Sequence, residues 1–170
     1  MYPLSQALID IKDTKSATTL LEASRDPKKT DPFYHYLLSR IQLQEGDPGS
    51  ARRSIMRALG RLTNRDFLSQ GIRVAVTEGD SDTILSMLDK IIELKEQDYV
   101  DLAELYRYLS DSSLIELQNK IVERFDRLAS KNIWVERMRR DRYIRENDLG
   151  EAEKVSRKIV ISRSKMIDDI

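Results

Sequence analysis

The chain has 170 residues, 34% of them charged and 40% hydrophobic, with a formal net charge of zero at pH 7. A chain of this length can bury a real core as one domain, and its balance of charged and apolar residues favours a helical globular protein over a disordered one. It has no cysteine, which excludes disulfides and thiolate metal sites and fits a reducing compartment. No apolar run approaches the roughly 18 residues of a membrane span and no signal peptide is evident, so we expect a cytoplasmic protein without membrane contact.

Charge is distributed unevenly along the chain. Residues 1–77 and 127–170 each carry a net charge of +4, whereas residues 78–126 carry −8. A basic, acidic and again basic order can steer a charged partner or favour self-association. A solvated surface with uneven charge explains the same pattern.

Helical periodicity runs through the whole sequence. The segment ILSMLDKIIEL places Ile84, Leu88 and Ile91 at spacings of four and three, and LIELQNKIVERF follows the same pattern. In chain order, the pattern breaks at RDPKKTDP, EGDPGS, EGDSD, LSDSS and ENDLG, which are clusters of turn residues. No run of strict alternation marks a strand. The sequence therefore predicts an all-α fold over residues 1–170.

Most of these breaks recur at a nearly constant spacing. The first inward residue of each second helix falls on Ala17, Ala51, Ile84, Ile115 and Ala152, at spacings of 34, 33, 31 and 37. The turn position falls on Lys12, Gly46, Gly79, Ser110 and Asn147. We interpret the chain as about five helix–turn–helix hairpins of about 34 residues, which must stack because one hairpin cannot bury its apolar face alone.

In this register the chain resembles the tetratricopeptide repeat family over nearly its full length, and best from Asp31 to Asn64. The family's tight-packing position falls on Ser5, Ser39, Ile72, Ala103 and Arg140. The large apolar position before it falls on Leu4, Leu38, Gly71, Leu102 and Arg139, so the third and fifth units depart from the pattern. The resemblance implies a single-domain, right-handed α-solenoid. A solenoid of irregular helical hairpins is the alternative.

The resemblance also implies a function, because the first helices of tetratricopeptide stacks line a concave groove that takes an extended peptide or a partner helix. The predicted groove residues are Phe33, Tyr36, Leu37, Arg40 and Arg73 in a basic half, with Glu104, Trp134, Arg137 and Asp141 in the far half. We therefore expect a noncatalytic protein–protein interaction scaffold or adaptor without a cofactor. Its partner would have an acidic end, apolar anchors and a basic end. A surface that merely solvates a structural scaffold is the plainer interpretation.

Catalytic motifs are scarce. His35 is the single histidine and there is no cysteine, which argues against a catalytic triad, a cysteine protease and a histidine-rich zinc site. The segment GDPGS lacks the lysine and hydroxyl residue of a phosphate-binding loop. Asp80 and Asp82 are more typical of turns and helix caps than of an acid–base pair. We expect neither an enzyme nor a metal site.

Nucleic-acid binding is a competing function. Arginines concentrate in residues 52–65 and 137–145, the second cluster beside Trp134 and Tyr143. Such clusters can hold phosphates and stack bases. The neutral net charge and the solvated helix face on which Arg53, Arg57 and Arg61 recur argue for an ordinary exposed surface instead.

Self-assembly is a further alternative. Several apolar residues of the last helix have no later hairpin to cover them: Val155, Ile159, Val160, Ile161 and Met166. They either pack inward or form the interface of a homo-oligomer.

Overall fold

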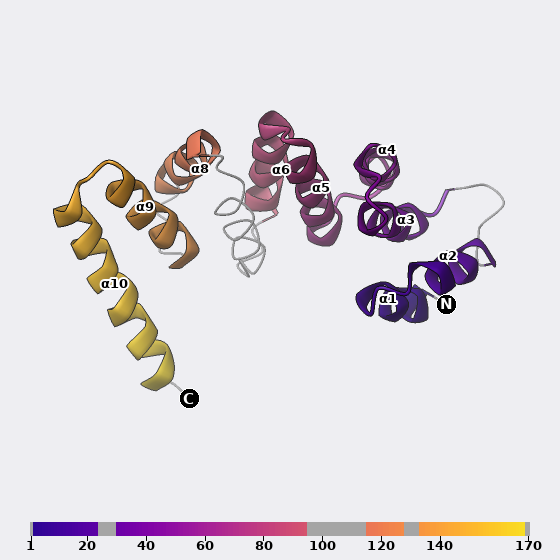
Figure 1. The fold of residues 1–170 in the computed structure, drawn as a ribbon, viewed down its shortest axis with the longest axis horizontal. Helices are drawn as coiled ribbons and strands as arrows, with labels where there is room; N and C mark the ends of the chain where they lie inside the picture. Colours follow the sequence, from indigo (N-terminus) through magenta and orange to yellow (C-terminus); the bar gives the residue numbers. More distant parts are fainter. Residues whose placement is uncertain (1, 24–29, 95–114, 128–132, 169–170) are drawn as a thin grey trace. The chain divides into compact units, whose positions relative to one another are not determined.

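The computed structural model describes residues 2–23, 30–94, 115–127 and 133–168. Within these residues every regular element is an α-helix and no strand occurs, which confirms the all-α prediction (Figure 1). Contacts divide the chain into two compact units, unit 1 over Met1–Glu96 and unit 2 over Gln97–Ile170. None of the described helices is long and apolar enough to cross a membrane.

The described residues of unit 1 form three helical hairpins. Their helices are α1 (Tyr2–Asp10), α2 (Thr14–Ala23), α3 (Pro32–Gln44), α4 (Pro48–Leu59), α5 (Arg65–Glu78) and α6 (Ser81–Glu93). The two helices of each hairpin contact each other, and α2 contacts α3 as α4 contacts α5. In addition, α3 contacts both α1 and α5, so the first helices of successive hairpins lie against one another.

The same turn joins the two helices of each described hairpin. Its central residue has a positive φ at the following four places: Lys12 (64°), Gly46 (79°), Gly79 (71°) and Asn147 (59°). An aspartate always follows, and its backbone N–H donates over 2.9 Å to the carbonyl five residues before it. This is the hydrogen bond that closes a helix ending in a left-handed residue. The predicted turn position is confirmed at these four residues, and Ser110 lies outside the described residues.

That aspartate also caps the second helix of its hairpin. In the four turns its Oδ1 accepts a backbone N–H from the residue three places on, which is Ser16, Ser50, Thr83 or Glu151, over 2.9–3.1 Å. The hydrogen bonds from Ser16 and Ser50 lower the pKa of Asp13 and Asp47 below the usual value. The prediction that Asp80 is a cap residue is therefore confirmed, and each hairpin begins its second helix in the same way.

The core of unit 1 is shared between neighbouring hairpins. One cluster joins Ile9 of α1 and Leu21 of α2 to Leu37 and Ile41 of α3. A second cluster consists of residues from α4 and α5, with Tyr36 and Leu43 of α3 packed against it. Each cluster therefore needs residues from two hairpins, as expected when a single hairpin cannot bury its apolar face alone.

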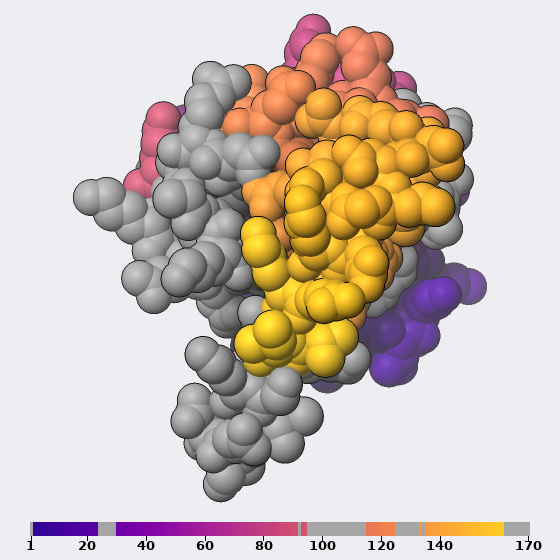
Figure 2. Space-filling view, turned by 90° about the vertical axis from the view of Figure 1, so that its left-hand side faces the viewer, coloured from indigo at the N-terminus to yellow at the C-terminus, as the bar shows by residue number. Residues whose placement is uncertain are grey.

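Unit 2 contains α8 (Ile115–Arg127), α9 (Ile133–Arg145) and α10 (Leu149–Asp168) among its described residues. In this unit α9 contacts both α8 and α10, and Figure 2 shows α9 and α10 side by side in orange and yellow. The residues that fill this core are Leu117, Ile121, Val122, Val135, Met138, Ala152 and Val155. The hairpin of α9 and α10 has the turn at Asn147 that it shares with unit 1.

The prediction that Ile115 is the first inward residue of α8 is wrong. Ile115 is 47% exposed, whereas Gln118 is 4% exposed and begins a buried set with Ile121 and Val122 three and four residues later. Ala51 begins the same set in α4, with Ser54 and Ile55. With Gln118 in place of Ile115, the spacings from Ala17 to Ala152 become 34, 33, 34 and 34. Because the residue at this buried position is the polar Gln118, the pattern of hydrophobic residues did not reveal the correct register.

The last helix divides its apolar residues between two environments. Val155 is buried and packs inward, and Ile159 is half-buried. Val160 and Ile161 are 65% and 56% exposed, and the side chain of Met166 lies outside the described part of the helix. Val155 therefore packs inward, whereas Val160 and Ile161, five and six residues later, leave an apolar surface exposed on the helix.

Candidate functional site

A row of aromatic rings crosses the first helices of unit 1. Tyr2 of α1 stacks on Phe33 of α3 with ring centroids 6.3 Å apart, and Phe33 meets the edge of Phe67 of α5 at 5.3 Å. Tyr36 of α3 also stacks on Phe67, with ring centroids 4.9 Å apart. Phe67 is fully buried, but Phe33 is 45% exposed. The row therefore presents an apolar surface that is anchored in the core.

Arg40 lies beside this row and links two hairpins. Its Nη2 lies 2.8 Å from Oδ1 of Asp10, and its guanidinium carbon lies 5.9 Å from the centroid of the Tyr36 ring. Gln6 donates to the same Asp10 oxygen over 2.9 Å. The Arg40 side chain is only 15% exposed, so its charge is largely balanced by Asp10. Arg40 thus contributes to the surface mainly through its position over Tyr36 and its contact across α1 and α3.

Most of the groove residues predicted on unit 1 are at least partly exposed, but one of them is buried. Phe33, Tyr36 and Arg40 come together as described above, and Arg73 is half-buried on α5. Leu37 is only 3% exposed and belongs to the core cluster of α1, α2 and α3. Leu37 is therefore a packing residue, because its position on α3 turns it toward α1 and α2 rather than outward.

The predicted far half of the groove falls in unit 2. Glu104 lies outside the described residues, and so does the side chain of Trp134, although Trp134 itself is part of α9. Arg137 is half-buried on the same helix. Asp141 accepts from Nη2 of its neighbour Arg140 over 2.6 Å, so its charge is engaged locally. Continuity between these residues and the surface on unit 1 stays a prediction.

Ion pairs engage one arginine of the first cluster and several arginines of the second cluster. In the first, Arg52 lies 2.8 Å from both Glu78 and Asp80. In the second, Arg139 lies 2.6 Å from Glu136 and Arg142 lies 2.9 Å from Glu146. Burial raises the pKa of Glu136, the carboxyl that Arg139 contacts. These contacts leave less free positive charge than the sequence suggests, which weakens the clusters as binding sites for a nucleic-acid backbone.

The sequence interpretation missed Tyr2, Asp10 and Phe67. A signal was available for the two aromatic residues, because Tyr2 stands 34 residues before Tyr36, and Phe67 stands 33 residues after Tyr34. Aromatic residues thus recur at equivalent turns of successive first helices. No such signal marks Asp10, whose contact with Arg40 depends on how α1 and α3 stack.

Comparisons with known proteins identify no relative of this chain. No protein-family model, no curated protein and no solved structure matches the chain. Among the described residues, no group of three His, Asp or Glu side chains is arranged to hold a metal ion.

Proposed function

We propose that the chain is a noncatalytic protein-interaction module that binds a polypeptide segment on the first helices of unit 1. The first-helix surface consists of Tyr2, Phe33, Tyr36 and Arg40. The observation that carries the proposal is Phe33, a phenylalanine 45% exposed that is held between Tyr2 and the buried Phe67. A pre-positioned aromatic ring loses little conformational entropy when a partner covers it, and such rings are frequent hot spots of interfaces.

The proposal includes a tetratricopeptide-like, right-handed α-solenoid. Two features of the described residues support a repeated hairpin: the contacts of α3 with α1 and α5, and the identical turns centred on Lys12, Gly46, Gly79 and Asn147. In such a stack the first helices line one surface, and the second helices line the other. The first-helix surface would then be part of a groove that continues from hairpin to hairpin.

The ligand that suits this surface is an apolar or aromatic side chain on an extended or helical segment. Phe33 and Tyr36 supply the apolar contact area, and Tyr2 supplies a further ring beside them. Arg40 is already paired with Asp10, so an acidic residue of the partner would gain less from it than from a free arginine. We therefore expect the aromatic contact to provide most of the affinity and the charges to fix orientation.

Selection of phage-displayed peptides on the purified chain tests this function. Peptides that bind the wild-type protein are synthesised, and their dissociation constants are measured by fluorescence anisotropy with the wild type, with Phe33→Ala and with the charge swap Asp10→Arg/Arg40→Asp. Phe33→Ala should weaken binding by about tenfold or more, as removal of a hot-spot ring does. The charge swap keeps an ion pair between α1 and α3, so a change in affinity reports on recognition rather than on folding.

A matched control is Met56→Ala, which removes a 50% exposed apolar side chain from the second helix α4. It should leave peptide affinity within about twofold of the wild type, because it lies on another helix of the hairpin. Far-UV circular dichroism and melting curves show that each variant is folded. Selected peptides that bind Phe33→Ala as tightly as the wild type would place the binding surface elsewhere.

A further inference from the structure

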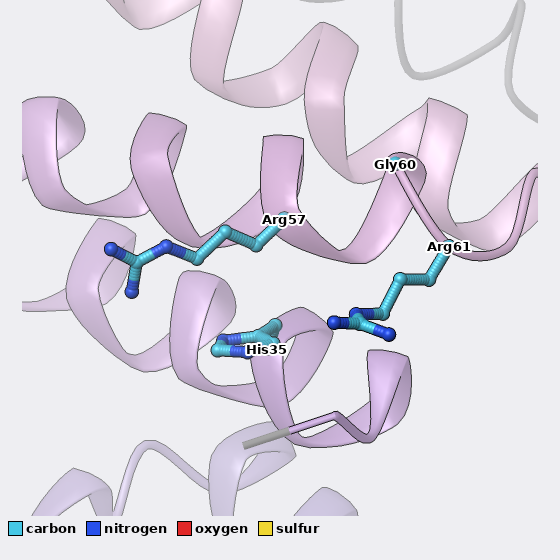
Figure 3. A pocket seen from close by; sticks show the side chains of 4 residues that line it. All are labelled: His35, Arg57, Gly60 and Arg61. Atoms are coloured by element: carbon cyan, nitrogen blue, oxygen red, sulfur yellow. The ribbon is translucent and has the colours of Figure 1, made fainter. Parts of the chain in front are cut away.

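A pocket opens between α3 and α4, away from the first-helix surface. It has a volume of about 650 Å³ and is lined by His35, Arg57, Gly60 and Arg61 (Figure 3). His35 projects from α3 about 160° around the helix axis from Phe33, given 100° per residue. The pocket is therefore distinct from the surface to which the proposed function is assigned.

Two arginines of α4 and the following turn supply the charge of this pocket. Arg57 lies in the last turn of α4 and Arg61 in the turn that follows it, and in the view of Figure 3 the His35 ring lies between their two separated guanidinium groups. Both side chains are exposed, whereas His35 is only 4% exposed and forms part of the wall. Gly60 has no side chain to fill the space between them.

Neither Arg57 nor Arg61 has a hydrogen bond or an ion pair with the described residues. Their neighbours in the same cluster differ: Arg52 is held by Glu78 and Asp80, and Arg53 donates to Ser50 over 2.7 Å. Two like charges that line one pocket repel each other while no anion lies between them. A bound anion would remove this repulsion.

We propose that this pocket binds a phosphate monoester dianion through the guanidinium groups of Arg57 and Arg61. A guanidinium donates two parallel N–H bonds to a phosphate, so two of them can engage a doubly charged group from both sides. A volume of about 650 Å³ lies within the range of small-ligand sites, so the pocket has room for the group that bears the phosphate. The same chemistry is offered by a small phosphorylated compound and by a phosphorylated side chain.

A nucleic-acid backbone fits the pocket less well. Such a backbone requires a row of available cations along its path. Here the row is interrupted, because Arg52 is held by Glu78 and Asp80 and Arg53 donates to Ser50, whereas Arg57 and Arg61 both line one pocket. The geometry thus favours a single, compact anion over a repeated one.

Isothermal titration calorimetry on the full chain tests the proposal at constant ionic strength. The probes are sodium phosphate, glycerol 2-phosphate and a phosphoserine peptide, with sodium chloride and the unphosphorylated peptide as references. We expect saturable binding of the phosphate probes and no binding of the references. The double variant Arg57→Gln/Arg61→Gln should weaken phosphate binding by about tenfold or more, because charge-assisted hydrogen bonds are lost.

The matched control is Arg53→Gln, which removes one arginine from the same helix but from outside the pocket. It should change phosphate affinity by no more than about twofold, because Arg53 donates to Ser50 and does not line the pocket, so it offers the anion no hydrogen bond. Tighter binding of glycerol 2-phosphate or of the phosphoserine peptide identifies which source of phosphate the pocket prefers.

Three results would overturn the proposal: no saturable phosphate binding, equal losses in Arg53→Gln and in the double variant, or tighter binding of a ten-nucleotide single strand with equal dependence on all three arginines. The last result would assign the cluster to nucleic acid. The double variant should leave peptide binding by Phe33 unchanged, so failure of this proposal and failure of the proposed function are distinguishable.

Discussion

Arg52 of α4 lies with its Nη1 atom 2.8 Å from Oδ2 of Asp80, the aspartate that caps α6 in the next hairpin. The same nitrogen lies 2.8 Å from Glu78, at the end of α5. Arg52 of the second hairpin thus forms ion pairs with two acidic residues beside the turn of the third hairpin. Since neighbouring hairpins share their core, a contact of this kind fixes the angle at which they stack.

Asp80 makes the stability of the chain depend on pH. Hydrogen bonds from the hydroxyl and backbone N–H of Thr83, with a contribution from Arg52, lower the pKa of Asp80 to about 2. A carboxyl whose pKa is lower in the folded state stabilises the fold above its ordinary pKa, and this stabilisation is lost as the pH falls toward 2. Asp80→Asn should therefore be less stable than the wild type at pH 7 by about 0.5–1 kcal/mol, a modest value because the ion pair is partly exposed.

Urea unfolding of both proteins at pH 7, 4 and 2 measures this dependence. Asparagine also caps helices well, so Asp80→Asn removes the charge and keeps the cap. The difference between the two proteins should shrink as the pH falls and be smallest at pH 2, where about half of the folded chains carry a protonated Asp80. Asp82→Asn, at an exposed residue without a hydrogen bond or ion pair to the described residues, is the matched control. A difference as large at pH 2 as at pH 7 would mean that the carboxyl acts through its shape rather than its charge.

Because the turn residues have a positive φ, we expect that replacing a turn glycine lowers stability and that introducing a glycine at a turn raises it. Gly46 has a φ of 79° and a Cβ added to it would meet nothing within 4 Å, so Gly46→Ala should destabilise the chain by about 1 kcal/mol through φ alone. Lys12 has a φ of 64° at the equivalent position, so Lys12→Gly should stabilise it by about 0.5–1 kcal/mol. Asn147→Gly should gain less, because asparagine tolerates this conformation.

Melting temperatures of these three variants measure the effect. Gly49→Ala is the control, because Gly49 lies inside α4 and an added Cβ would meet nothing closer than 3.8 Å. It should leave stability unchanged or raise it slightly, as alanine favours helices over glycine. If Lys12→Gly lowers the melting temperature, the turn at Lys12 is stabilised by its side chain more than it is strained by its φ.

The turns were the most predictable part of the fold. The spacing of the inward residues of the second helices placed Lys12, Gly46, Gly79 and Asn147 at the turn position, although only two of them are glycines. This worked because the hydrogen bonds that close each helix are local and depend on a few neighbouring residues. The interior of α8 was less predictable, because Gln118 is polar yet buried.

The candidate surface was predictable only in part. Phe33 and Tyr36 could be assigned from the repeat, since a helical register places them one turn apart. The balancing of Arg40 by Asp10 and the burial of Leu37 depend on how α1, α2 and α3 stack. Those are contacts between residues far apart in sequence, and a helical period alone does not determine them.

Gly71 shows why the third hairpin departs from the repeat pattern. A Cβ at Gly71 of α5 would overlap Sδ of Met87 in α6 and lie 2.7 Å from its Cε. In the second hairpin the equivalent residues, 33 positions earlier, are Leu38 and Ser54. Between the two hairpins the large and the small residue have exchanged helices in the sequence, an exchange that would fill the space between the helices from the other side. Substitutions that keep total volume are tolerated best, which explains how both hairpins keep one architecture.

This exchange predicts strong coupling between positions 71 and 87. Gly71→Leu alone should destabilise the chain by about 1–3 kcal/mol through overpacking, and Met87→Ser alone by about 2–4 kcal/mol through a cavity and a buried hydroxyl. The double variant recreates the leucine and serine of the second hairpin, so it should be more stable than either single variant.

Urea unfolding of the four proteins in this double-mutant cycle measures the coupling, which we expect to be about 1–3 kcal/mol in favour of the double variant. Leu88→Ala combined with Gly71→Leu is the matched control, since Leu88 is also buried in α6 but is not the residue that a Cβ at position 71 would overlap. The losses of stability in that pair should add up or exceed their sum, because the cavity left by Leu88→Ala does not lie where the leucine at position 71 needs space. Additive losses for Gly71→Leu and Met87→Ser would show that the two hairpins achieve their packing by unrelated means.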